Sequence, residues 1–202
     1  NQKLGTQMKA TGEVMSVGRT FEESLLKAIR SLETGVNHLY MHKFEKEKTE
    51  SLMDYIKIGT DDRIYGIAEL LRRGCEVSVI AAETGIDCFF LNKMQKIVDM
   101  EMELKQCPGD KAALYQAKKM GFSDKALAWL WDKKETDIFK MRKEARIFPV
   151  YKMIDTCASE FESYVPYFYS TYEVENESVI EAGKKIIVLG SGPIRIGQGV
   201  EF

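Results

Sequence analysis

The chain has 202 residues, of which 45% are hydrophobic and 30% charged, and this is ordinary for a globular protein with an extensive core. Its net charge of −2 argues against general binding of nucleic acid, because such binding depends on neutralising phosphates. The longest apolar runs, such as VSVIAA, fall well short of the roughly 20 residues that a membrane-spanning helix needs.

The first predicted helix begins at a capping box. In Thr20-Phe-Glu-Glu23 the threonine and the glutamate can each satisfy a backbone amide at a helix start. The apolar stripe that follows at helical spacing consists of Leu25, Ile29 and Leu32. Gly35 can end this helix in a left-handed conformation. The preceding residues contain no signal peptide, and the missing initiator methionine indicates a chain that is processed or cut from a longer protein.

Two further helices in the middle of the chain each follow an aspartate. Asp62 is the expected cap of the first, and Gly74 is expected to end it. Its stripe is Ile64, Ile67, Ala68 and Leu71. Asp87 is the expected cap of a longer helix, which ends before the Pro-Gly-Asp turn at 108–110. The apolar face of that helix is formed by Leu91, Met94, Val98 and Met102.

Three shorter helices are predicted next. Asp110 caps the first of them and Gly121 ends it, Ser123 opens the second, and the last extends from Thr136 to about Arg146. The apolar residues expected on these helices are Leu114, Ala117, Met120, Leu127, Leu130, Trp131, Ile138 and Met141. The charged runs EKEKTE and DKKETD are interpreted as solvated surface.

The pattern changes after the last helix. The stretch IFPVYKMIDTCASEFESYVPYFYSTYE mixes prolines, aromatic and β-branched residues without a helical period, and it predicts extended connecting segments. Residues Lys185 to Leu189 are predicted to form a buried strand that leads into a glycine-rich loop. The sequence therefore divides into an N-terminal stub, a helical middle and the beginning of an α/β domain.

Two segments have the Ala-x3-Gly-x5-Leu spacing of a helix–turn–helix. They are Ala81, Gly85 and Leu91, and Ala117, Gly121 and Leu127. A DNA-reading helix needs exposed Arg, Asn or Gln at its start, whereas Phe89 and Phe90 stand there in the first segment. The spacing therefore favours helix packing, and a helix–turn–helix nucleic-acid-binding module is kept as the alternative function.

The terminal loop carries a weak nucleotide signal. Gly190-Ser-Gly192 resembles the opening of a dinucleotide fingerprint, but Arg195 stands where the third glycine belongs. A free-standing dinucleotide enzyme would need about a hundred further residues to complete its domain. The closely spaced glycines, up to Gly199, let the backbone approach a ligand or another segment.

Few other residues are candidates for chemistry. The cysteines, which are Cys75, Cys88, Cys107 and Cys157, form no C-x-x-C pair, and His38 and His42 stand near none of them in sequence. We therefore expect no zinc site and favour reduced, partly buried thiols in a cytosolic protein. Glu13 is either a solvated acid on a turn or a buried acid lining a site, and spacing does not decide between these alternatives.

Four segments together resemble one family. TQMKATGEVMSVGRTFEESLLKAIRSLE and VLGSGPIRIGQGVEF are similar to parts of the large subunit of carbamoyl-phosphate synthetase. PVYKMIDTCASEF and YFYSTYE resemble the stretch before its second synthetase half. The resemblance implies a mainly α fold, a helical oligomerisation domain flanked by the ends of two ATP-grasp-type α/β halves. It assigns residues 1–30 to the first half, 31–170 to the helical domain, and 171–202 to the linker, first strand and loop of the second half.

The same resemblance implies an activity for the parent enzyme. That enzyme makes carbamoyl phosphate from bicarbonate, glutamine-derived ammonia and two ATP, for arginine or pyrimidine synthesis in the cytoplasm. It uses ATP with Mg²⁺ or Mn²⁺, and K⁺, and it works with a glutamine amidotransferase subunit or domain. The family's ATP-grasp motifs are absent from this chain. We therefore expect no catalytic, cofactor-binding or metal-binding residue here, an inert isolated chain, and no nucleic-acid or membrane partner.

The resemblance also assigns residues to a tunnel through which carbamate moves between the two active sites. The positions that match tunnel-lining segments are Met8, Glu13, Gly199 and Glu201. Small and apolar walls suit a reactive intermediate that must be kept from water, and carboxylates repel an anion. The family role further implies a homo-oligomer formed by the helical domain. Candidate contact residues are Phe89, Phe90, Trp129 and Trp131, although aromatic residues more often belong to a core.

Overall fold

The computed structural model describes residues 6, 12–157, 160–161, 167–179, 182–189 and 194–195. Helices dominate this part of the chain, so the predicted mainly α fold is confirmed. The helices are α1 (Phe21–Ser31), α2 (His42–Glu45), α3 (Thr49–Ile56), α4 (Arg63–Arg72), α5 (Val77–Thr84), α6 (Cys88–Gln106), α7 (Lys111–Lys119), α8 (Asp124–Leu130) and α9 (Glu135–Glu144). The strands are β1 (Gly12–Glu13), β2 (Val150–Met153), β3 (Phe168–Thr171) and β4 (Ile194–Arg195).

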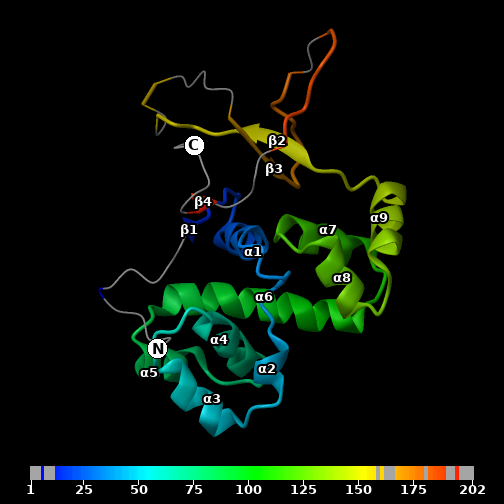
Figure 1. The fold of residues 1–202 in the computed structure, drawn as a ribbon. Helices are drawn as coiled ribbons and strands as arrows, with labels where there is room; N and C mark the ends of the chain where they lie inside the picture. Colours follow the sequence, from blue (N-terminus) through cyan, green and yellow to red (C-terminus); the bar gives the residue numbers. More distant parts are fainter. Residues whose placement is uncertain are drawn as a thin grey trace.

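The long helix α6 lies at the centre of the fold (Figure 1). It contacts α4 and α5 on one side and α1, α7 and α8 on the other. Its buried apolar residues are Leu91, Met94, Ile97, Val98, Met100 and Leu104. Because these side chains face both groups of helices, α6 joins the two groups into one hydrophobic core.

Four of the predicted helix caps are confirmed. The side chains of Thr20, Asp87 and Asp110 accept hydrogen bonds from amides in the first turns of α1, α6 and α7, at 3.2, 2.7 and 2.8 Å. Ser123 does the same for α8, at 3.0 Å. Each bond satisfies an amide that the helix itself leaves without a partner. These contacts span only two or three residues, which is why the sequence pattern identified them.

The predicted cap at Asp62 is wrong. Asp62 precedes α4, but its side chain makes no capping hydrogen bond. Its carboxylate instead accepts hydrogen bonds from Tyr55 at 2.7 Å and Thr60 at 2.9 Å, and it pairs with Lys43. The ammonium group of Lys43 comes from α2, so a contact made by the tertiary fold replaces the local one.

Some helices were not predicted, or were predicted with wrong faces. The run EKEKTE was interpreted as solvated surface, and its residues are exposed except for the half-buried Thr49. The helix α3, which begins at Thr49 and buries Leu52 and Ile56, was not predicted. Met102 and Leu32 were assigned to apolar stripes, but each is 41% exposed. Met102 lies in α6 but outside its buried arc, which is narrower than the simple spacing rule assumes. Leu32 follows the last residue of α1.

The part of the chain after α9 agrees with the prediction in one segment and differs from it in another. β2 and β3 pair antiparallel as a ribbon, with Tyr151 opposite Ser170, in agreement with the extended segments expected there. The strand predicted at Lys185 to Leu189 is absent from the structure, and Ile186 to Leu189 are 85–92% exposed. A buried strand needs neighbours that share its backbone hydrogen bonds, and none of the described strands pairs with these residues.

Candidate functional site

The predicted tunnel positions fall at the two ends of the chain. Met8, Gly199 and Glu201 lie outside the described residues. Glu13 lies in β1, where its backbone is described but its side chain is not. The sequence left open whether Glu13 is solvated or lines a site, and its side-chain environment therefore stays a prediction.

The strand β1 joins the two ends of the chain. It pairs antiparallel with β4, so that Gly12 lies opposite Arg195 and Glu13 opposite Ile194. Figure 1 shows this pair beside the start of α1. The strands β1 and β4 are thus neighbours, although about 180 residues separate them in sequence.

The beginning of α1 is held by a carboxylate. Glu23 is only 1% exposed, and its Oε2 accepts a hydrogen bond from the backbone amide of Arg19 at 2.7 Å. Its Oε1 forms an ion pair with Lys27 at 2.8 Å. Gly18 lies so close that an added Cβ would come within 2.9 Å of the Glu23 carboxylate. The sequence predicted the capping role of this glutamate but not these further contacts.

A buried charged cluster connects α6 with α4 and the segment after α1. Glu101 of α6 is 1% exposed, and both its oxygens accept hydrogen bonds from Arg72 at 2.7 Å. His38 Nε2 lies 2.7 Å from Glu101 Oε1. Burial by itself would raise the pKa of Glu101, but the hydrogen bonds and charges of Arg72 and His38 lower it to about 2. Because the ionised carboxylate can only accept, His38 Nε2 carries the proton in this contact.

A second charged cluster lies between α7, α8 and α9. Asp124 accepts hydrogen bonds from Arg142 Nη2 and from Lys118 Nζ, each at 2.8 Å. Burial opposes ionisation of Asp124, yet the hydrogen bonds from Arg142 and Lys118 give a net lowering of its pKa. Burial also lowers the pKa of Lys118. In both clusters the carboxylate is already paired with cations, so the arrangement suits stabilisation of the fold and not proton transfer.

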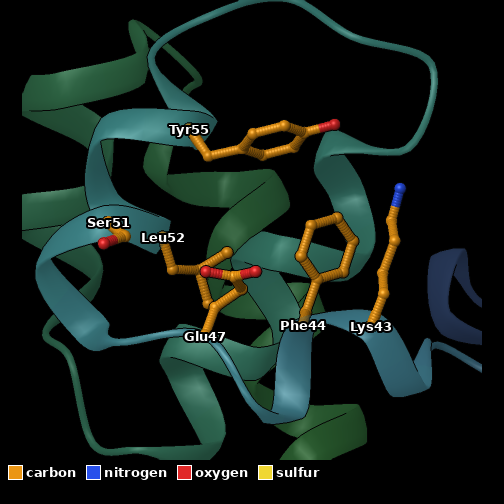
Figure 2. A pocket seen from close by; sticks show the side chains of 6 residues that line it. All are labelled: Lys43, Phe44, Glu47, Ser51, Leu52 and Tyr55. Carbon is orange, nitrogen blue, oxygen red and sulfur yellow. The ribbon is translucent and has the colours of Figure 1, made fainter.

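A small hollow lies between α2 and α3. Figure 2 shows Phe44 and Tyr55 on one side of it, with ring centroids 5.4 Å apart, and the side chains of Glu47 and Leu52 on the other. Its volume is about 220 Å³, which is below the roughly 300–1,000 Å³ of typical small-molecule pockets. The hollow is therefore interpreted as surface relief and not as a substrate pocket.

Three of the four candidate contact aromatics are exposed. Phe89, Phe90 and Trp129 are 55%, 45% and 46% exposed. The ring of Phe90 lies 5.5 Å from that of Phe21 and 5.3 Å from that of Phe89, so these three rings form one surface cluster. Trp131 is buried, and its Nε1 donates to the backbone oxygen of Leu104 at 2.7 Å. Trp131 therefore belongs to the core and cannot contact a partner.

The two helix–turn–helix spacings lie at turns between packed helices. Gly85 has a φ of 69° after α5, and Gly121 has a φ of 97° after α7. Leu91 and Leu127 are fully buried, and Ala117 is buried as well. The small and apolar residues thus serve helix packing, as the sequence favoured, and the exposed side chains in the first turn of α6 include Phe89 and Phe90 but no Arg, Asn or Gln before Leu91.

Within the part of the chain that the structure describes, no group of three or more His, Cys, Asp or Glu side chains lies close enough to hold a metal ion. The four cysteines are free thiols, of which Cys88 is exposed. In the described ranges no helix has both the length and the apolar character that crossing a membrane requires.

The residues that organise this structure were mostly missed from the sequence. His38 was considered only as a metal ligand, and Lys27 and Arg72 were not considered. One signal was available for Glu101, because it lies seven residues after Met94 and three after Val98 and so on the buried face of a predicted helix. A charged residue in an apolar stripe indicates a buried partner.

One protein-family model matches the helical part of the chain. The family model described as carbamoyl-phosphate synthetase large chain, oligomerisation domain, matches residues 13–146, which is about two thirds of the chain. The matched range extends from the second residue of β1 to just beyond α9 and so includes every helix that the structure describes.

Proposed function

The chain belongs to the family of the carbamoyl-phosphate synthetase large chain through its oligomerisation domain, and on that premise we propose that it connects the two synthetase halves of this ligase. In this proposal residues 1–30 end the first half, 31–170 form the helical domain, and 171–202 begin the second half. The helical core around α6 supplies a rigid body between them.

The proposed parent enzyme makes carbamoyl phosphate from bicarbonate, ammonia released from glutamine, and two ATP, with Mg²⁺ or Mn²⁺ and K⁺. An amidotransferase subunit or domain supplies the ammonia, and the product serves arginine or pyrimidine synthesis. This chain contributes connection, self-association and part of the carbamate tunnel wall, and the chemistry belongs to the ATP-grasp parts.

The pairing of β1 with β4 is the observation that supports the tunnel role most directly. A tunnel between two active sites needs wall residues from both halves at one place. Glu13 is in β1, whereas Gly199 and Glu201 follow β4 by only a few residues. Because β1 and β4 are paired and each assigned wall residue lies in or shortly after one of them, the pairing supports wall residues from both ends of the chain at one place.

Replacing Gly199 with phenylalanine in the full-length synthetase should uncouple its two partial reactions. A glycine wall position leaves no room for a side chain, so the large ring narrows the passage. Both ATP sites remain intact, and bicarbonate-dependent ATP hydrolysis continues while synthesis falls. We expect the ratio of ATP hydrolysed to carbamoyl phosphate formed to rise on the order of tenfold.

Graded variants provide the controls for this experiment. Gly199→Ala adds one methyl group and should raise the ratio far less than Gly199→Phe. Glu13→Gln and Glu201→Gln change the charge without blocking the path, so a mild loss is expected. If folded Gly199→Phe enzyme keeps the wild-type ratio, the tunnel assignment of this loop is wrong.

Self-association is the second part of the proposal. The description of the family domain as an oligomerisation domain supports it, and so do the exposed aromatic side chains at the start of α6 and on α8. Large exposed aromatic side chains are the residues that most often dominate protein–protein contacts. Phe89, Phe90 and Trp129 are therefore the candidates, and Trp131 is not one of them.

Changing Phe89, Phe90 and Trp129 to serine together should weaken the oligomer of the full-length synthetase. The dissociation constant, measured by sedimentation over a concentration series, should rise at least on the order of tenfold. The control replaces Val174 and Val179, which are 88% and 86% exposed but lie outside the helices, with serine. An unchanged assembly state in the folded triple variant contradicts the assignment of these residues.

A further inference from the structure

The ammonium group of Lys27 contacts three separate segments of the chain. Its Nζ donates to the backbone oxygen of Val17 at 2.8 Å and to that of Ser170 at 2.5 Å. It also pairs with Glu23 Oε1, one turn earlier in α1, at 2.8 Å. An ammonium group has three donors, and three acceptors surround this one.

The three segments have different positions in the chain. Val17 lies between β1 and α1, Glu23 is part of α1, and Ser170 lies in β3, 143 residues after Lys27. The Nζ of Lys27 also lies 5.6 Å from the centre of the Tyr169 ring, which adds a cation–π contact on the same strand. One side chain therefore ties the segment that follows β1 to the ribbon that precedes the C-terminal residues.

This contact is not a loose surface ion pair. The Lys27 side chain is 20% exposed and that of Glu23 is 1% exposed. Exposed pairs contribute little because both side chains remain solvated and mobile. Here the second oxygen of Glu23 is fixed by the amide of Arg19, so the carboxylate holds the ammonium in one orientation.

The N-terminal segment is held on the same face by other contacts. Ser16 Oγ donates to the backbone oxygen of Ser24 at 2.7 Å, and Gly18 lies against Glu23. These contacts connect the segment to α1 alone. Lys27 donates to both the segment and β3, and Arg19 of the segment also has a side-chain hydrogen bond with Tyr169 of β3.

We propose that Lys27 is a positioning residue that fixes the N-terminal connection of the helical domain relative to its C-terminal connection. This inference rests on the proposed function, since those connections lead to the two synthetase halves. If the tunnel walls come from β1 and from the loop after β4, the tie keeps them at a constant separation. Lys27 touches no reacting atom and acts only through Val17, Glu23 and Ser170.

The first test measures hydrogen exchange in this 202-residue chain. Lys27→Met keeps the apolar stem and removes the donors, so exchange should rise on the order of tenfold in both 12–19 and 167–172. Lys140→Met removes an exposed ammonium from α9 and should change neither segment. Lys27→Arg retains the charge and should restore part of the protection, and thermal unfolding checks that each variant is folded. A rise in only one segment, or in neither, overturns the proposal.

The second test uses the full-length synthetase. Lys27→Met should raise the ratio of ATP hydrolysed to carbamoyl phosphate formed, with Lys27→Arg between it and the wild type. A normal ratio in Lys27→Met, when Gly199→Phe is uncoupled, overturns the positioning role alone. A normal ratio in both variants overturns the proposed tunnel and with it the role of Lys27, and the exchange experiment still decides whether the tie exists.

Discussion

Replacing Glu101 with glutamine is expected to lower the free energy of unfolding by about 3 kcal/mol, and by up to about 5 kcal/mol. The substitution removes the carboxylate of a buried ion pair but leaves the charged guanidinium of Arg72 buried. The shape of the side chain is retained, but Arg72 and His38 lose the charge that compensates their burial. The Arg72 side chain is only 13% exposed, so water cannot replace the lost partner. Denaturant unfolding of the chain measures the effect.

The matched control is Glu103→Gln, two residues further along the same helix. Glu103 is exposed, and a surface substitution of this kind changes stability by no more than about 0.5 kcal/mol. A loss of less than about 1 kcal/mol for Glu101→Gln would mean that the cluster is compensated by solvent and does not hold α4 and α6 together.

The same cluster predicts a pH dependence of stability. The pKa of Glu101 is about 2 in the folded chain, below its ordinary value of 4.5. Its contribution is therefore present in full above the unfolded pKa and is lost as the pH falls from about 4.5 towards 2. The wild type and Glu101→Gln should differ most near neutral pH and converge only as the pH approaches about 2. A difference that stays constant over this range contradicts the lowered pKa.

Replacing Gly121 with alanine should destabilise the fold by about 2 to 4 kcal/mol, for two separate reasons. Its φ of 97° is a conformation that side chains rarely adopt. An added Cβ would also lie 2.9 Å from Glu23 Cα and 3.1 Å from Glu23 O, which are backbone atoms of α1 that cannot move aside. Arg30 Nη1 donates to the backbone oxygen of Gly121 at 2.7 Å, so any shift strains this bond too.

A variant at a second glycine, Gly74, separates the cost of the backbone conformation from the cost of the steric clash. Gly74 has a φ of 82°, but nothing lies within 4 Å of its would-be Cβ. Gly74→Ala should therefore show only the backbone cost, of about 1 to 2 kcal/mol. The excess in Gly121→Ala measures how closely the turn after α7 packs on α1. Equal losses in the two variants, determined by chemical denaturation, would show that this close approach is absent.

The candidate site was only partly accessible to sequence reasoning. The family resemblance was carried by segments at both ends, and the family match over 13–146 supports it. The tunnel residues assigned there remain predictions. The tie at Lys27 gave no sequence signal, because a lysine in the second turn of an amphipathic helix is ordinarily solvated.

The amino-acid sequence by itself determined the helical class and the starts of α1, α6, α7 and α8. The caps Thr20, Asp87, Asp110 and Ser123 act over two or three residues, and such contacts follow from local backbone geometry alone. Gly121 likewise ended its helix where expected, because a left-handed residue after a helix favours glycine.

The tertiary structure alone decided which polar groups are buried and with whom. Asp62 could cap α4, yet it binds groups from α2, α3 and the loop after α3. Trp131 could belong to a contact surface, yet it donates to α6 from within the core. Glu101 and Lys27 find partners 63 and 143 residues away. A buried charge is stable only where such partners converge, and their convergence depends on how the helices pack around α6, which no local sequence pattern specifies.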